Sequence, residues 1–204
     1  MSGKESLPLL LLHQCCAICS VPAVRELSAS YRIHGYWYNP NIQPPEEYNS
    51  RREALAEFNR LSGIKTFLFE EERASGKDLF SPPELPAPGR CAFCYRERLN
   101  RIARFASQNG YLYFSTTLFS SPYQQHELAR EIASEAARRW GVSLVYFDVR
   151  KNYYAGLDEI RKMGLYRQRY CGCLMSLAER NADGNKKKKP RVKNEMITSA
   201  ISPL

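Results

Sequence analysis

Apolar runs and helical segments alternate along the chain. Short continuous apolar runs are typical of strands buried on both faces of a parallel sheet, and apolar residues recurring every third or fourth position predict helices. The predicted strands are 9–12, 33–38, 64–69, 111–115 and 142–149, and the predicted helices are 22–29, 46–61, 96–107, 125–140 and 157–163. This order predicts an α/β protein whose mainly parallel sheet has helices on both faces. Arg51 is expected on the polar face of helix 46–61.

The predicted topology also locates a site. Parallel strands end at one edge of the sheet, and ligands of such proteins bind beyond that edge. Cys15 follows the first predicted strand, Asn39 and Asn41 the second, 115–122 the fourth, and Arg150 with Lys151 the fifth. We therefore expect these loops to converge on one face.

Length and charge bound the organisation of the protein. With 204 residues, 44% of them hydrophobic, the chain can bury one core, which predicts one catalytic domain over 1–180. The segment 181–204 is poor in apolar residues, contains four consecutive lysines, and is predicted to be a disordered basic tail. The net charge of +9 suits a polyanionic partner, although a solubilising surface with a free tail accounts for it equally well.

No apolar run reaches the roughly 18–20 residues that span a bilayer. The leucine-rich run 7–12 precedes Cys15 but is shorter than a signal-peptide core, and Gln14 takes the place of a small residue at the cleavage position. We expect a buried strand there, and a cytoplasmic protein that does not associate with membranes.

Seven cysteines fall in three clusters: Cys15, Cys16 and Cys19; Cys91 and Cys94; Cys171 and Cys173. Buried structural cysteines scatter singly, and an odd count without a signal peptide argues against extracellular disulfides. Two C-x-x-C spacings suit zinc or an iron–sulfur cluster, but zinc would account for four cysteines and leave three over.

The Cys171-Gly172-Cys173 pair has a different chemistry. A disulfide across one intervening residue is strained, and strain makes such a bond labile and redox-active. Four thiolates for a metal centre and a dithiol for electrons together suit a reduction. The alternative, that Cys171 and Cys173 ligate the same metal, stays open.

These motifs resemble a known family. The segments that carry the resemblance are HQCCAIC at 13–19, GRCAFCYRERL at 89–99 and YRQRYCGC at 166–173, with YNPNI at 38–42, STTL at 115–118, SSPYQ at 120–124 and DVRK at 148–151. They are similar to the cobalamin-independent epoxyqueuosine reductases, the QueH family, over roughly 9–180. The resemblance implies the last step of queuosine synthesis, on an adenine nucleotide alpha-hydrolase-like (HUP, Rossmann-like) fold.

The resemblance also implies site residues and partners. Cys15, Cys16, Cys91 and Cys94 would ligate a [4Fe–4S] cluster, with Cys171 and Cys173 as the catalytic redox pair. In an alternative, Cys19, Cys171 and Cys173 hold an additional iron. The partners would be a tRNA bearing epoxyqueuosine and an external electron donor, with no DNA. The candidate substrate-binding residues are Asn39, Asn41, Tyr123, Arg150, Lys151, Arg167, Gln168 and Tyr170, and Tyr123 or Tyr170 is the candidate proton donor.

Two other functions compete with this interpretation. An iron–sulfur tRNA thiolase of the same fold needs a glycine-rich loop after the first strand to bind pyrophosphate, and 14–19 contains no glycine. A zinc-bearing RNA-binding module explains the basic charge and both C-x-x-C spacings, but it leaves Cys171-Gly172-Cys173 without a role.

Overall fold

The computed structural model describes residues 6–68 and 89–184. Its centre is a parallel sheet of five strands in the order β3-β2-β1-β4-β5. The strands are β1 (Leu9–His13), β2 (Arg32–Trp37), β3 (Lys65–Leu68), β4 (Tyr113–Thr116) and β5 (Ser143–Leu144). The predicted parallel α/β architecture is confirmed.

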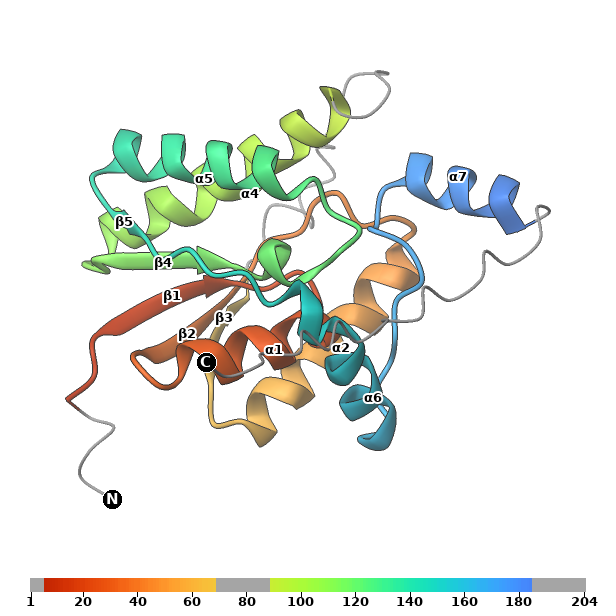
Figure 1. The fold of residues 1–204 in the computed structure, drawn as a ribbon, viewed down its shortest axis with the longest axis horizontal. Helices are drawn as coiled ribbons and strands as arrows, with labels where there is room; N and C mark the ends of the chain where they lie inside the picture. The colour runs from red at the N-terminus through yellow and green to blue at the C-terminus, as the bar shows by residue number, and fades with distance from the viewer. Residues whose placement is uncertain (1–5, 69–88, 185–204) are drawn as a thin grey trace, which may run out of the picture.

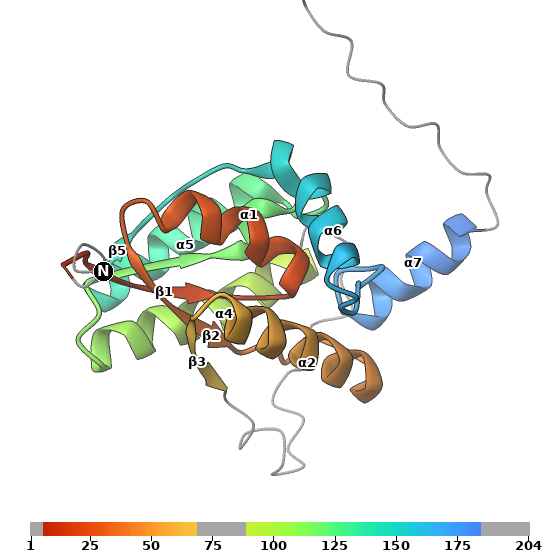
Figure 2. The ribbon, with the colours of Figure 1, turned by 90° about the horizontal axis from the view of Figure 1, so that it is seen from below.

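Helices cover both faces of this sheet (Figure 1). One face carries α1 (Ala17–Leu27), α2 (Pro45–Leu61) and α6 (Tyr153–Lys162), and the other carries α4 (Gly89–Gln108) and α5 (His126–Trp140). The short helices η1 (Thr117–Ser120) and η2 (Arg150–Asn152) lie in loops, and α7 (Leu174–Gly184) extends away from the sheet (Figure 2). None of the helices in the described ranges is long and apolar enough to cross a membrane.

The core forms because β1 is the central strand. Leu10, Leu11 and Leu12 are fully buried, as the uninterrupted leucine run predicts for a strand covered on both faces. The helices α4 and α5 bury small residues on their facing sides, which allows the two helices to approach closely. These are Ala103 and Ala106 on α4 and Ala129, Ala133 and Ala136 on α5.

Several predicted boundaries differ in the structure. The helix expected at 22–29 begins at Ala17, with Pro22 inside it. Proline interrupts a helix by removing the hydrogen bond to the carbonyl four residues earlier, which here is Ile18. A Cβ at Gly156 of α6 would lie 2.8 Å from that carbonyl oxygen, so α6 packs directly over the interruption. The helix expected at 96–107 begins at Gly89, which places Cys91 and Cys94 in the first turns of α4.

The carboxyl-terminal part differs most. The strand expected at 142–149 pairs only over Ser143–Leu144, and the helix expected at 157–163 begins at Tyr153. The helix α7 was not predicted and continues to Gly184, past the expected tail boundary at 181. Residues 185–204, and residues 69–88 between β3 and α4, lie outside the described residues.

Candidate functional site

The first cysteine cluster lies at the carboxyl ends of the neighbouring strands β1 and β4. The helix after β1 covers one face of the sheet and the helix after β4 covers the other. The crevice between two such strands is the usual ligand site of open α/β sheets. Cys15 follows β1, and its backbone N–H donates to Thr117 Oγ1 (3.0 Å) in the segment that follows β4. The first cysteine cluster therefore sits at the edge that the topology predicts.

The thiols of Cys15, Cys16 and Cys19 form one compact cluster. Their Sγ atoms all lie within 4.8 Å of one another, and those of Cys15 and Cys16 are 3.8 Å apart. Cys16 caps α1, and its sulfur accepts the Cys19 N–H (3.4 Å) and the Gln168 side-chain amide (2.6 Å). The amino-terminal end of α1 thus presents its positive dipole end to this group.

Hydrogen bonds within this group stabilise one thiolate. Bonds from Cys16 and Cys19, with a further bond from the Thr117 hydroxyl (3.3 Å), hold the pKa of Cys15 well below its usual value. Burial raises the pKa of Cys16, and donation to Cys15 raises that of Cys19. A metal would displace these protons, because thiols bind metals as thiolates.

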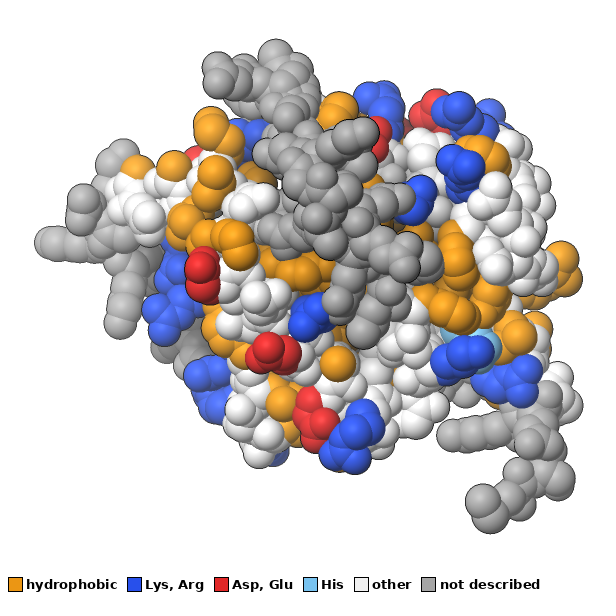
Figure 3. Space-filling model, turned by 180° about the vertical axis from the view of Figure 1, so that it is seen from behind, with side chains coloured by type: hydrophobic (Ala, Val, Ile, Leu, Met, Phe, Trp, Pro, Cys, Tyr) orange, Lys and Arg blue, Asp and Glu red, His pale blue; other side chains and the backbone are white. Residues whose placement is uncertain are grey.

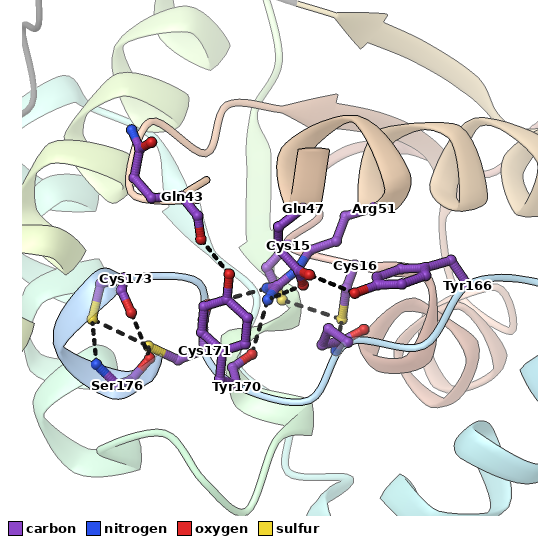
Figure 4. Close-up of polar contacts among 11 residues, drawn as sticks. Cys15, Cys16, Gln43, Glu47, Arg51, Tyr166, Tyr170, Cys171, Cys173 and Ser176 are labelled. Atoms are coloured by element: carbon purple, nitrogen blue, oxygen red, sulfur yellow. Dashed lines mark hydrogen bonds and ion pairs between the residues drawn. The ribbon is translucent and has the colours of Figure 1, made fainter. Parts of the chain in front are cut away.

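The thiols of Cys171 and Cys173 are positioned by the backbone of the loop that carries them. Gly172 has φ +121°, a conformation that a side chain disfavours, and a Cβ there would lie 3.0 Å from Ile42. Arg51 donates to the carbonyls of Tyr170 (3.0 Å) and Cys171 (3.2 Å), as Figure 4 shows. The side chain of Arg51 is 2% exposed, so the expectation that it lies on the polar face of its helix is wrong.

Cys171 and Cys173 are free thiols with sulfurs 3.6 Å apart. The hydrogen bond from Cys171 lowers the pKa of Cys173 to about 5, with further contributions from Ser176 and the charge of Arg90. The same bond and burial raise the pKa of Cys171. Cys173 is therefore the thiolate of the pair, and Cys171 keeps the proton.

A buried arginine lies between the cysteine clusters. Arg98 is 3% exposed and donates to the Cys94 carbonyl (3.4 Å) and to Asn39 Oδ1 (3.5 Å). Within the part of the chain that is described, it has no carboxylate partner. Its charge acts instead on Cys94, Cys15 and Cys171. Sequence reasoning missed this residue, since an arginine in a helix ordinarily faces solvent.

This arrangement fits an anionic, thiolate-bound centre. A buried charge needs a counter-charge, and the groups around Arg98 that can supply one are thiols. Burial raises the pKa of both Cys91 and Cys94, as expected for thiols that are protonated when no metal binds them. Iron–sulfur clusters take such cysteine ligands, so the side chains present suit that group. Cys19, which the sequence left undecided, lies with Cys15 and Cys16.

A cavity of about 550 Å³ opens between the first cysteine cluster and Cys171, and its lining does not include Cys91 or Cys94. The cysteines on its wall are Cys15, Cys16, Cys19 and Cys171. Among the expected substrate residues, Tyr123, Gln168 and Tyr170 line it. The other expected substrate residues do not line the cavity. Asn39 and Asn41 are buried elsewhere, and Arg150, Lys151 and Arg167 lie outside the cavity wall. The lining residues that sequence reasoning missed include Arg51, Tyr153, Tyr154 and Arg180.

Two exposed tyrosines stand on the wall of the cavity. The hydroxyls of Tyr123 and Tyr154 are 3.0 Å apart, and the rings are 69% and 59% exposed. The Tyr153 ring meets both edge-on, at centroid distances of 5.6 and 5.5 Å. The contact with Tyr154 raises the pKa of Tyr123 to about 12, so its hydroxyl keeps its proton at neutral pH.

Comparison with known proteins decides the family. The family model described as "Epoxyqueuosine reductase QueH" matches residues 10–179. This chain belongs to the QueH family. An epoxyqueuosine reductase QueH from Dehalococcoides mccartyi is 38% identical over 85% of this chain and 94% of its own length. The one from Thermotoga maritima is 33% identical over 84% and 91%.

A solved structure supports the fold. The U34-tRNA thiolase NcsA from Methanococcus maripaludis, solved with its [4Fe-4S] cluster, aligns with a TM-score of 0.51 over 90% of this chain and 69% of its own. This likeness shows that the two chains share their α/β fold over most of this chain. At 12% identity, it carries no information on which reaction the QueH chain performs.

Proposed function

We propose that this QueH chain reduces epoxyqueuosine to queuosine at the wobble position of tRNA. The reaction opens an epoxide to an alkene and releases its oxygen as water, which consumes two electrons and two protons. The observation that carries the proposal is the convergence of the first cysteine cluster and Cys171 on one cavity. Family membership supports the same activity.

A [4Fe–4S] cluster would be held by Cys15, Cys16, Cys91 and Cys94. When bound, it supplies single electrons and a Lewis-acidic iron for the epoxide oxygen. The buried charge of Arg98, between Cys15 and Cys94, supports an anionic centre at this position. The Sγ atom of Cys19 lies within 4.8 Å of those of Cys15 and Cys16, which favours a position for Cys19 beside these ligands over a separate iron site with Cys171 and Cys173.

The dithiol of Cys171 and Cys173 would supply the electrons. Closing it to a disulfide releases two electrons and, because Cys173 is already a thiolate, one proton from Cys171. The second proton for the departing water would come from the proton donor of the cavity, which completes the balance of the epoxide reduction. The low pKa of Cys173 supports this role, because a thiolate is the reactive form of cysteine. An external electron donor would then reduce the disulfide again.

The remaining groups of the cavity would bind and orient the substrate. Both tyrosines border the cavity, but Tyr123 is the better-placed proton donor. Its hydroxyl contacts the exposed Tyr154 hydroxyl, whereas the Tyr170 hydroxyl donates to the Gln43 carbonyl. The exposed rings of Tyr123 and Tyr154 suit stacking against unpaired anticodon bases, as in other proteins that bind single-stranded RNA. Gln168 lies beside Cys16 and could hydrogen-bond the modified base.

The proposal is tested on anaerobically purified protein by iron, sulfide and zinc analysis, followed by nucleoside analysis of the tRNA product. We expect four iron and four sulfide per chain, and loss of product in Cys94→Ser and Cys173→Ser. Cys94→Ser should also lose iron, while Cys173→Ser should retain it. One zinc without sulfide would favour the RNA-binding module and contradict the reductase.

A further inference from the structure

A basic, aromatic cleft lies between α4 and α5, outside the cysteine cavity. It has a volume of about 270 Å³ and is lined by Tyr38, Glu97, Asn100, Arg101, Arg104, Arg139 and Trp140. Basic side chains occur at several separate places on the face shown in Figure 3, so charge alone does not mark a site. This cleft combines charge with concavity and aromatic rings.

The arginines of the cleft are held in place by the rings. The guanidinium carbons of Arg104 and Arg139 lie 5.8 and 5.7 Å from the centroid of the Trp140 ring. Trp140 is itself fixed by its indole N–H, which donates to Asn100 Oδ1 (3.3 Å). Among the residues that the structure describes, neither Arg104 nor Arg139 makes a hydrogen bond or an ion pair, so their N–H donors are available to a ligand.

The cleft continues the cysteine site along one helix. Cys94 lies near the start of α4, and Arg98, Arg101 and Arg104 follow at intervals of three or four residues. Arg101 lies over the Tyr38 ring at 5.4 Å. The next residue, Asn39, accepts from Arg98 at the cysteine site. Ten residues of helix span about 15 Å, a distance that a few nucleotides of RNA can bridge.

We propose that this cleft binds the RNA backbone of the same tRNA, away from the modified base. Arg104 and Arg139 would contact phosphate oxygens, and the rings of Tyr38 and Trp140 offer faces for a base or ribose. The inference rests on the proposed function, which supplies the RNA. An acidic electron-transfer protein is the other macromolecule a basic surface could attract, but such a partner has no need of a concave aromatic wall.

The test uses the iron-loaded protein and full-length tRNA bearing epoxyqueuosine. The double variant Arg104→Gln/Arg139→Gln is compared with Arg138→Gln, an exposed neighbour on α5 that does not line the cleft. We expect binding to tRNA to weaken about tenfold at low salt, and the slope of log Kd against log salt to fall by about two for two lost phosphate contacts. Turnover of the free epoxyqueuosine nucleoside should be unchanged, and lysine at both positions should restore much of the slope.

The outcomes separate the two claims. A salt slope equal to that of Arg138→Gln, or no tRNA binding by the unaltered protein, overturns the inference. A rate loss seen with a protein electron donor but not with dithionite assigns the cleft to a redox partner and also overturns it. If tRNA binds with the expected slopes but no queuosine forms, the cleft stands and the proposed reaction fails.

Discussion

Replacing Arg51 by methionine should release the loop that carries the redox cysteines. Methionine keeps much of the aliphatic volume but removes the two hydrogen bonds to the carbonyls of Tyr170 and Cys171 (3.0 and 3.2 Å). It also leaves Glu47, whose side chain is 10% exposed, without its cation. Arg51 thereby connects α2 to a segment about 120 positions later in the chain.

The expected magnitude follows from these contacts. Hydrogen bonds from a charged donor contribute about 1.5–3 kcal/mol each, and breaking a buried ion pair costs about 3–5 kcal/mol. Because water can reach the freed carbonyls, we expect the lower end, about 3 kcal/mol of lost docking free energy. This corresponds to roughly a hundredfold change in the opening equilibrium.

Amide hydrogen exchange at Gln43 measures this opening directly, since its N–H donates to the Gly172 carbonyl (2.8 Å). Arg60→Met is the matched control on the same helix, because Arg60 is exposed and pairs only with Glu57 among the described residues. Exchange at Gln43 should accelerate about a hundredfold in Arg51→Met and stay unchanged in Arg60→Met. Equal exchange in both variants would refute the account of Arg51.

Three further predictions concern separate parts of the molecule. Gly172→Ala should lower turnover about tenfold or more while iron is retained, because the backbone φ of +121° strains a side chain there by about 1–3 kcal/mol. The control Gly164→Ala, at φ +68° with no atom within 4 Å of the added Cβ, should leave turnover unaffected. Arg98→Met removes a buried cation beside the cluster ligands, so potentiometry should show a lower reduction potential, whereas Arg96→Met should match the unaltered protein. Burial lowers the pKa of His126, so the native state disfavours its protonation. The contribution of His126 to the free energy of unfolding should therefore be complete above the ordinary pKa near 6.5 and fall as pH drops below it. Urea titrations should show a smaller difference in that free energy between pH 7.5 and pH 5.5 for His126→Gln than for the unaltered protein.

The fold was largely predictable because burial patterns mark its strands and helices. The exceptions have physical causes. Residues 145–149 continue the apolar alternation of β5, and Phe147 and Val149 are buried, but apolar packing does not require a paired strand. The helix α7 makes a weak pattern because Leu174 and Met175 are 57% and 50% exposed, so little of it packs against the core.

The site divides in the same way. The position of the first cysteine cluster could be predicted, since its spacing and the end of β1 are local features of the chain. Arg51 and Arg98 could not, because each is an arginine in an amphipathic helix and such residues usually face water. Their partners come from distant segments: Arg51 donates to a carbonyl at Cys171, and Arg98 donates to Asn39 and interacts through its charge with Cys15 and Cys171. Only the tertiary structure supplies these partners.

The central claim is that the converging cysteines perform a two-electron reduction of epoxyqueuosine in tRNA. Iron-loaded protein, incubated without oxygen with tRNA bearing epoxyqueuosine and a chemical reductant, tests it most directly by mass analysis of the nucleosides. We expect queuosine in place of epoxyqueuosine, and none with Cys173→Ser. Unchanged epoxyqueuosine under conditions in which the Thermotoga maritima relative converts it would contradict this reduction.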